Sequence, residues 1–325
     1  MSDALLLGLD IGGTASRALL ADEHGHRLGF GTAAGGNPSA HHVPDAVGAV
    51  ETAVRAALDG FDPGQVTAAV VGMAGVGRME EPTVRQAFDA MWHQVGLRCP
   101  YRTVADAVVA FAAGTAAPDG TLLLAGTGAI AAQLRDRTLL RIADGHGWLL
   151  GDLGSGFWLG REAVRATLAH LDGWTPDSPL VRKVLADLLR VTDLPPSREA
   201  VTAVINAVRR QPPVSLARFA PVVCEVAAAG DPGAGEIVAR AAGHLVDSAN
   251  RVRTGGDGPL VLAGSLLTAD TPLAAEVRSV ALRQWPGVPI GVATDGAAGA
   301  VWLAALDSPS AASSPEELHA TLLGT

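Results

Sequence analysis

The chain has 325 residues, 48% of them hydrophobic, and a formal net charge of -9. This length predicts two domains of ordinary size, with ample material for two cores. The negative charge and the lack of any dense Lys/Arg run argue against a surface that binds nucleic acid or an anionic membrane, so we expect small-molecule partners.

The cysteines and the only lysine exclude further classes of protein. Cys99 and Cys224 are too few and too far apart for a disulfide framework or a zinc site, and they favour a reducing compartment. The N-terminal apolar run is interrupted by Asp10 and has no basic region before it, and no uncharged stretch reaches the roughly 18 residues of a membrane span. We therefore predict a cytoplasmic protein. Lys183 stands outside any Gly-x-x-x-x-Gly-Lys-Ser/Thr pattern, which excludes a P-loop.

Residues 5–22, LLLGLDIGGTASRALLAD, run an apolar strand into a glycine turn and out into a second strand. Gly12 and Gly13 lack a Cβ, so we expect positive φ there and backbone N–H groups that approach an anion, with the Thr14 hydroxyl as a further donor. Asp10, in an apolar strand, either caps its own turn or holds a hydrated Mg²⁺ ion beside a nucleotide. We favour the metal role because carboxylate, glycines and hydroxyl share one turn.

The rest of the first half alternates strands with helices. A third strand at residues 27–32 predicts an antiparallel meander, and a loop follows at 33–44. In that loop the amide of Asn37 suits sugar hydroxyls, although on spacing alone its position before a proline favours a turn former. Beyond the loop, the apolar spacing predicts helices at 45–58 and 81–95 and strands at 68–73 and 101–104.

Asp106 follows the strand at 101–104, where a helix begins. An aspartate at this position is either the helix N-cap or a general base, which takes the proton from a substrate hydroxyl as it attacks a phosphoryl group. The local pattern favours neither role. The repeated architecture of the chain favours the base, because a carboxylate at the end of a sheet strand faces a crevice.

Residues 121–136, TLLLAGTGAIAAQLRD, repeat the strand, glycine turn and strand of the first hairpin. Gly126, Thr127 and Gly128 stand where the first turn has its glycines and threonine. One such turn is weak evidence, because a glycine hairpin between buried strands is mostly just a hairpin. Two of them, one at the start of each half, predict a cleft that holds a polyphosphate.

The second half begins with strands and continues into a block of helices. We expect a smaller lobe at residues 1–115 and a larger one at 116–307. The tail 308–325, which we expect to be mobile at 308–314 with a short helix at 316–322, could join the first lobe. The predicted strands are 122–125, 131–135, 139–143, 260–263 and 290–293, and the predicted helices are 157–171, 180–189, 199–209, 216–229, 235–253 and 296–306.

The loop at residues 144–156, DGHGWLLGDLGSG, combines many glycines with a tryptophan, a histidine and aspartates. We expect Ser155 to cap the next helix and Trp148 to lie in the core. Asp152, an acceptor-only side chain among glycines, is expected to bind two adjacent hydroxyls. The role of His146 stays open, because a lone histidine in a loop is more often structural or solvated than catalytic.

Gly264 follows the predicted strand at 260–263 and precedes Ser265. It either ends the strand or lets an adenine ring lie against bare backbone.

Three motifs together carry a resemblance to a known superfamily. Asp10-Ile-Gly-Gly-Thr14 resembles the first phosphate motif of the actin, sugar kinase and heat-shock chaperone ATPases, Leu124-Ala-Gly-Thr-Gly128 the second, and Val261-Leu-Ala-Gly-Ser265 the adenosine motif. Their order and spacing extend over nearly the whole chain. Asn37, Asp106 in an Ala-Asp-Ala run, and the loop from Gly147 to Ser155 are most similar to the N-acetylglucosamine kinase branch of the BadF/BadG/BcrA/BcrD ATPase group.

The resemblance implies an α/β protein with the two-lobed actin-like, ribonuclease H-like ATPase fold. Each lobe is then a mixed sheet flanked by helices, and the larger second lobe carries a helical insertion. It also implies an ATP-dependent sugar kinase in which Asp106 is the base toward the sugar 6-hydroxyl and Asp10 belongs to the Mg²⁺ shell. The residues it places on the sugar are Asn37, Asp106, Ala129, His146, Gly147 and Asp152, and those it places on ATP are Gly12, Gly13, Thr14, Gly126, Thr127, Gly128, Gly264 and Ser265.

The sequence departs from this family pattern at three positions near the sugar. Leu153 stands where the loop usually has glutamate, His146 where tryptophan is common, and Ala129 where a small polar residue would contact the sugar. An engaged hydroxyl is worth about 1 to 3 kcal/mol when its partner would otherwise be left unpaired. The sequence therefore supports phosphoryl transfer better than it supports the identity of the sugar. The first hypothesis is phosphorylation of N-acetylglucosamine, and a kinase of a related sugar such as glucosamine is an alternative.

A further alternative is a non-kinase ATPase that activates a partner enzyme. Members of that kind in the same group hold an iron–sulfur cluster through a cysteine pair near the second phosphate motif, and Cys99 and Cys224 do not have this spacing. The helical block could also carry the interface of a homodimer, although one sequence does not separate that role from core packing.

Overall fold

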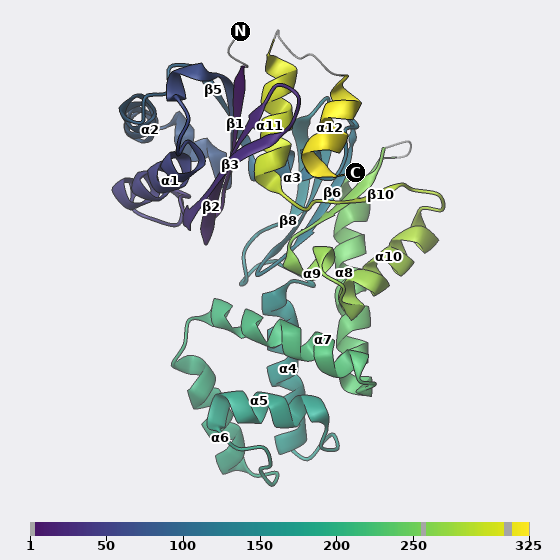
Figure 1. The fold of residues 1–325 in the computed structure, drawn as a ribbon. Helices are drawn as coiled ribbons and strands as arrows, with labels where there is room; N and C mark the ends of the chain where they lie inside the picture. Colours follow the sequence, from purple (N-terminus) through teal and green to yellow (C-terminus); the bar gives the residue numbers. More distant parts are fainter. Residues whose placement is uncertain (1–3, 255–257, 309–313, 325) are drawn as a thin grey trace. The chain divides into compact units, whose positions relative to one another are not determined.

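The computed structural model of the chain describes residues 4–254, 258–308 and 314–324 (Figure 1). The chain forms two compact units. Unit 1 contains Met1–Gly120, Leu134–Leu140 and Gly291–Thr325, and unit 2 contains Thr121–Gln133 and Arg141–Ile290.

The first five-stranded sheet, in unit 1, has the strand order β3-β2-β1-β4-β5. The pairs β1/β2 and β2/β3 are antiparallel, which confirms the predicted meander, and β1/β4 and β4/β5 are parallel. Its strands are β1 (Leu5–Ile11), β2 (Ala15–Asp22), β3 (Arg27–Ala34), β4 (Val66–Met73) and β5 (Tyr101–Ala105).

Helices cover both faces of this sheet. Successive residues of β1 point to opposite faces, and those on each face contact helices. Leu5, Leu7 and Leu9 share a buried core with residues of two helices, α1 and α2. The other face of β1 meets α11, since a Cβ on Gly8 would overlap the carbonyl oxygen of Ala297. The helices of unit 1 are α1 (Val43–Ala57), α2 (Pro82–Gln94), α3 (Asp106–Ala112), α11 (Gly296–Asp307) and α12 (Pro315–Leu323), with 3-10 turns η1 (Pro63–Gln65) and η2 (Val76–Glu80).

The second five-stranded sheet has the order β10-β9-β6-β7-β8, and β6 and β9 are parallel. Buried residues of β6 and β9, such as Leu123 and Leu262, form one apolar core with the helices of unit 2. The strands are β6 (Gly120–Ala125), β7 (Ala129–Arg135), β8 (Thr138–Asp144), β9 (Leu260–Ala263) and β10 (Ile290–Val292). The helices are α4 (Gly156–Leu171), α5 (Pro179–Leu189), α6 (Arg198–Arg209), η3 (Pro213–Phe219), α7 (Ala220–Ala228), α8 (Pro232–Val252), α9 (Ser265–Thr268) and α10 (Pro272–Gln284).

Most predicted elements match the structure within a few residues, and two predictions were wrong. The single helix expected at 216–229 is the turn η3 followed by α7, because Pro221 occupies the first turn of a helix, where its missing N–H costs nothing. The sequence prediction also omitted α10, although Leu273, Ala274, Val277 and Ala281 show a helical apolar spacing.

The predicted division into domains, residues 1–115 and 116–307, stays a prediction. The unit to which α11 belongs differs from the one expected. This helix was placed in the second lobe, whereas it contacts β1 and β4 and belongs to unit 1. α12, the predicted short helix at 316–322, also belongs to unit 1. The mobility expected at 308–314 falls largely on 309–313, which lie outside the described residues.

Within the described part of the chain no single helix is long and apolar enough to cross a membrane, and the one helix pair that meets the length and composition criteria together, Pro213–Ala228 with Pro232–Val252, is bent by 117°.

Candidate active site

Asp10 lies near the end of β1, on the face of the strand that α11 covers. Its register partner on β2 is Arg17, whose Nη1 lies 3.5 Å from Oδ2 of Asp10. The side chain of Asp10 is 23% exposed and that of Arg17 is half exposed. The partner that a carboxylate in an apolar strand requires is therefore a cation across the hairpin.

The N-terminus of α11 meets the same carboxylate. Oδ1 of Asp295 caps this helix by accepting hydrogen bonds from the N–H groups of Ala297 and Ala298, at 3.1 and 3.2 Å. The next residue is Gly296, and a Cβ there would stand 2.6 Å from Oδ2 of Asp10. Only glycine permits so close an approach of the helix to Asp10.

Neighbouring carboxylates and burial act together on the pKa of Asp10. Burial raises this pKa to about 6, Arg17 opposes the rise, and the charges of Asp106 and Asp295 add to it. A site that brings these carboxylates within electrostatic range favours a bound cation.

Mg²⁺ fits this donor set. It prefers oxygen ligands, and it usually takes one or two protein carboxylates together with phosphate oxygens and water. Among the described residues no group of three or more His, Cys, Asp and Glu side chains could hold a metal ion.

Asp106 is the first residue of α3, at the end of β5, and is partly buried. The helix cap position is Ala105, so Asp106 is not the N-cap, although its Oδ1 accepts a hydrogen bond from the Ala107 N–H at 2.9 Å. Burial raises the pKa of Asp106, and that hydrogen bond opposes the rise. A carboxylate with a raised pKa is a better proton acceptor near neutral pH.

Asn37 is 8% exposed and forms the turn that its position before proline predicted. Its Oδ1 accepts from the Ser39 N–H at 2.7 Å, and its backbone oxygen accepts from the N–H groups of Ala40 and His41. Nε2 of His41 lies 2.7 Å from the carbonyl oxygen of Gly13. This loop is therefore attached to the first glycine turn.

Each glycine turn is closed by one internal backbone hydrogen bond, which spans three residues in the first turn and two in the second. The Gly12 N–H donates to the Ala15 oxygen, and the Gly126 N–H donates to the Gly128 oxygen, each at 2.9 Å. Thr14 and Thr127 are exposed at the tips.

The expectation of positive φ in these turns was wrong, because none of Gly12, Gly13, Gly126 and Gly128 has it. The missing side chain matters here because of the room that it leaves, and not because of an unusual backbone conformation. A Cβ on Gly126 would meet no atom within 4 Å, so there is open space beside this residue, although its N–H and its carbonyl oxygen are bonded to Gly128 and Gly156.

Asp152 connects the second glycine turn to the loop that follows β8. Its Oδ1 accepts from the Ala129 N–H at 3.2 Å, and a Cβ on Gly128 would lie 3.0 Å from its carboxylate oxygens. Burial raises the pKa of Asp152, with the Ala129 bond opposing. One of its oxygens is thus committed to the protein, so the expected grip on two hydroxyls is narrower than the sequence suggested.

Residues 146–148 of this loop lie at its surface. His146 is exposed and close enough to Asp152 to lower the pKa of that aspartate, while Gly147 has φ of 80° and a Cβ there would meet no atom within 4 Å. The prediction that Trp148 is a core residue was wrong, because it is 37% exposed with its ring 5.7 Å from that of Phe157. Ser155 caps α4 as predicted, accepting from the Trp158 N–H at 3.2 Å.

Gly264 has φ of 82°, and a Cβ there would overlap the carbonyl oxygen of Ala125 at the end of β6. Packing between β9 and β6 therefore explains why this residue is glycine. This agrees with the first of the two interpretations from sequence, in which Gly264 ends the strand. The next residue, Ser265, is exposed and begins α9. A contact of either residue with adenosine stays a prediction.

The predicted site residues fall into two groups, one in each unit. Unit 1 brings together Asp10, Gly12, Gly13, Thr14, Asn37 and Asp106. Unit 2 brings together Gly126, Thr127, Gly128, Ala129, His146, Gly147 and Asp152, with Gly264 packed beside Ala125 and Ser265 following it. That the two groups form one cleft stays a prediction.

Sequence reasoning missed three charged residues. Arg17 could have been found by pairing the strands of the first hairpin across its turn, which sets it opposite Asp10. Asp144 accepts from the N–H groups of Asp152 and Leu153 at 2.6 and 2.8 Å, and its position before glycine is typical of an aspartate that organises a turn. Asp295 begins a helix, yet nothing local links it to Asp10.

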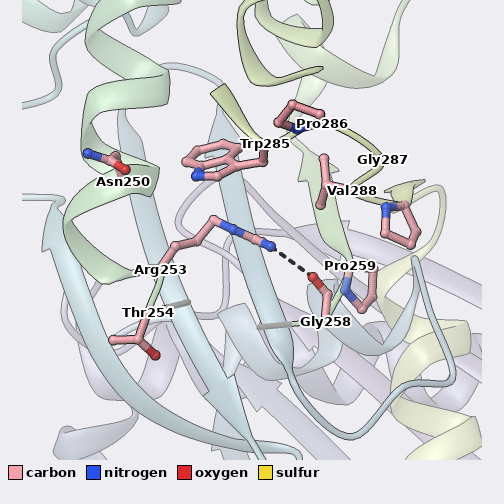
Figure 2. A pocket seen from close by; sticks show the side chains of 10 residues that line it. Asn250, Arg253, Thr254, Gly258, Pro259, Trp285, Pro286, Gly287 and Val288 are labelled. Carbon is pink, nitrogen blue, oxygen red and sulfur yellow. Dashed lines mark hydrogen bonds between the residues drawn. The ribbon is translucent and has the colours of Figure 1, made fainter. Parts of the chain in front are cut away.

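A pocket of about 480 Å³ in unit 2 contains none of the predicted residues (Figure 2). It lies where β9 and β10 begin, whereas Gly264 follows the end of β9. Figure 2 shows Arg253 between Trp285 and Gly258; its guanidinium carbon is 5.0 Å from the centre of the Trp285 ring, and its Nη2 donates to the Gly258 oxygen at 3.0 Å. We assign no ligand to this pocket.

Known proteins resemble this chain over most of its length. The model of the BadF/BadG/BcrA/BcrD ATPase family matches residues 7–304. An N-acetyl-D-glucosamine kinase from Dictyostelium discoideum is 26% identical over 262 residues, which are 78% of this chain and 80% of that protein.

Solved structures share the fold. A Chromobacterium violaceum protein assigned as an N-acetylglucosamine kinase is 26% identical, with a TM-score of 0.72 over 93% of this chain and 99% of that one. A ROK family glucokinase from Streptomyces griseus, solved with glucose and AMPPNP, is 21% identical, with a TM-score of 0.56 over 93% of this chain and 99% of that one. The predicted α/β fold class of the actin-like sugar kinases is confirmed.

Proposed function

Because the chain belongs to the BadF/BadG/BcrA/BcrD ATPase family, we propose that it transfers the terminal phosphoryl group of ATP to N-acetylglucosamine, giving N-acetylglucosamine 6-phosphate. The chain is a sugar kinase. The observation that carries the sugar assignment is the relative named N-acetyl-D-glucosamine kinase, which aligns over 78% of the chain. A kinase of this kind takes a sugar and ATP as its small-molecule partners.

We assign the general base to Asp106. The Ala107 N–H holds Oδ1, so Oδ2 is the oxygen that we place toward the sugar 6-hydroxyl. Removing the hydroxyl proton as the oxygen attacks the phosphorus makes the alcohol a competent nucleophile. Partial burial of Asp106 supports this assignment, because it raises the pKa of the carboxyl toward the working pH.

The polyphosphate is assigned to backbone and hydroxyl donors. The turns that would hold it are Gly12, Gly13 and Thr14 in unit 1 and Gly126, Thr127 and Gly128 in unit 2. The N–H groups of Gly12 and Gly126 are bonded within these turns, so the donors that we assign to the phosphates are the exposed hydroxyls of Thr14 and Thr127 and the other N–H groups of the turns. Asp10 would hold Mg²⁺, which neutralises charge on the phosphates when it is bound. Arg17, half exposed beside Asp10, adds a cation to the same turn.

The sugar and the adenosine are assigned to the remaining residues. Asn37 and the second oxygen of Asp152 are placed on sugar hydroxyls, with Ala129, His146 and Gly147 lining the same subsite. Gly264 and Ser265 are placed on the adenosine. A cytoplasmic location and a homodimer are further proposals that rest on the sequence.

The test is sugar-dependent release of ADP from Mg-ATP with a panel that contains N-acetylglucosamine, glucosamine, glucose and N-acetylmuramic acid. We expect the largest kcat/KM for N-acetylglucosamine, and phosphorus and proton NMR should place the phosphate on the 6-oxygen. A larger kcat/KM for glucosamine would move the assignment to that sugar. Turnover that no sugar raises above the ATPase background would reject a sugar kinase.

A further inference from the structure

We propose that α12 positions the two catalytic carboxylates of unit 1, and that Arg27 is the positioning residue through which it acts on Asp10. This inference rests on the function proposed for Asp10 and Asp106. Two hydrogen-bond paths carry it. One runs from the last turn of α12 to the start of α11, which lies against Asp10, and the other runs from the middle of α12 to α3, which begins with Asp106.

The first path begins at the end of α12. Nε and Nη2 of Arg27, on β3, donate to the carbonyl oxygen of Leu322 at 3.0 and 2.7 Å. Nη1 of the same guanidinium donates to Oδ2 of Asp295 at 2.8 Å. Leu322 lies in the last turn of the helix, where carbonyl oxygens lack partners within the helix. The planar guanidinium fork of Arg27 thus fixes two acceptors at once.

Asp295 transmits this contact to Asp10. While Oδ2 of Asp295 is held by Arg27, its Oδ1 caps α11 through the N–H groups of Ala297 and Ala298. The residue between them and Asp295 is Gly296, whose bare Cα faces Oδ2 of Asp10. The position of the first turn of α11 therefore bears on the position of Asp10.

The second path runs from the middle of α12 to α3. His319 is buried, and its Nε2 lies 2.8 Å from the carbonyl oxygen of Ala112, the last residue of α3. Because a carbonyl only accepts, Nε2 of His319 carries the proton of this hydrogen bond. α3 begins with Asp106, so α12 is bonded to the far end of the helix that presents the base.

A third contact joins the beginning of α12 to α11. Nε1 of Trp302, on α11, donates to the carbonyl oxygen of Pro315 at 2.9 Å, and the ring of His319 stands edge-on to that of Trp302 at 5.1 Å. α12 is therefore fixed to α3, which begins with Asp106, and to α11, whose first turn lies against Asp10 of β1. A misplacement of a reacting group by about 1 Å can cost roughly 10²-fold in rate, so loss of such a contact should lower kcat.

The variant Arg27→Gln tests the first path. Arg27 is 43% exposed, so its replacement should leave the protein folded. We expect kcat to fall about 10-fold, with both KM values within about 2-fold. The matched control is Arg55→Gln, which breaks the exposed pair with Glu51 on α1 and should leave kcat unchanged. Arg27→Lys keeps the charge but lacks the fork, so it should recover only part of kcat.

Amide hydrogen exchange supplies a readout that does not depend on the sugar. In Arg27→Gln the amides of Ala297 and Ala298 should exchange faster than in the unaltered protein, whereas Arg55→Gln should leave them unchanged. Unaltered exchange and unaltered kcat in Arg27→Gln would overturn the proposal, as would a higher KM with normal kcat. If the unaltered protein phosphorylates no sugar, the proposed function fails, and the exchange at Ala297 and Ala298 still decides whether Arg27 fixes the start of α11.

Discussion

At the scale of single residues, the site is dominated by carboxylates whose burial lowers the stability of the folded protein. Asp10 and Asp106 both have a raised pKa because burial disfavours their charge. The structure opposes the rise only in part, through Arg17 at one site and the Ala107 N–H at the other. Such residues are expected where function has taken precedence over stability.

Asp106→Asn is the sharpest test of the base. The amide keeps the shape and still accepts the Ala107 hydrogen bond, so sugar and ATP should bind as before. Turnover should fall by roughly 10²-fold or more, because no group takes the hydroxyl proton. In the unaltered enzyme kcat/KM should fall with decreasing pH through an apparent pKa above the ordinary aspartate value, since burial raises the pKa of Asp106.

The variant should lack that acidic limb. Steady-state kinetics across pH, with binding followed by calorimetry, measure both effects. Unchanged turnover in Asp106→Asn would assign the base to another residue.

Asp10→Asn should raise stability at neutral pH. The pKa of Asp10 is about 6 in the folded protein and lower in the unfolded chain, so between those values the folded state binds more protons. Its free energy of unfolding therefore falls as pH rises through that window, and the cost is fully present above about pH 6. Removing the charge should increase the free energy of unfolding at pH 7.5 by on the order of 1 to 3 kcal/mol, with little change near pH 4.

Urea unfolding without Mg²⁺ or nucleotide measures this difference. The control is Asp59→Asn, on the exposed surface after α1, which should change stability little at either pH. A less stable Asp10→Asn at pH 7.5 would contradict the prediction and would indicate that the pair with Arg17 outweighs burial.

At the scale of elements, the sequence predicted where the glycine turns and the strand ends lie. It did not predict the structural reason why those positions hold glycine. The apolar runs predicted β1, β4 and β6 because buried strands leave a continuous signal in sequence. The glycines of the turns were correctly placed, but positive φ was the wrong reason. Gly264 is the reverse case, since it has positive φ and packs against the end of β6.

Gly264→Ala should destabilise the protein through this packing. The new methyl group would overlap the Ala125 carbonyl, and the alanine would have to adopt a φ of 82° with a ψ of 151°, which is a region used almost only by glycine. We therefore expect a loss of about 2 kcal/mol or more in the free energy of unfolding. The matched control is Gly243→Ala within α8, where a Cβ meets no atom within 4 Å. That change should be neutral or stabilise by about 0.5 to 1 kcal/mol. Equal stability of the two variants, measured by thermal unfolding, would show that β9 moves to accommodate the methyl group.

At the scale of the whole molecule, sequence reasoning failed where distant segments meet. Asp10 lies near the end of one strand and Asp106 follows another, and this local signal placed both. The partners of Asp10 at α11, and the contact of Arg27 with Leu322, depend on residues nearly the whole chain apart. The periodicity of the sequence does not show which distant segments contact each other. The sequence prediction therefore put α11 in the second lobe, whereas the helix belongs to unit 1. The three-dimensional contacts show where this helix belongs, for example the close fit of Gly8 against Ala297.

The division of unit 1 between both ends of the chain bears on how the protein forms during synthesis. Residues through Gly120 leave the ribosome first, but α11, which covers one face of β1, lies beyond Gly291. At roughly 5 to 20 residues per second, on the order of ten to thirty seconds separate the two segments. Unit 2 is nearly continuous between them. We therefore expect the apolar face of the nascent first sheet to stay uncovered until α11 has been synthesised.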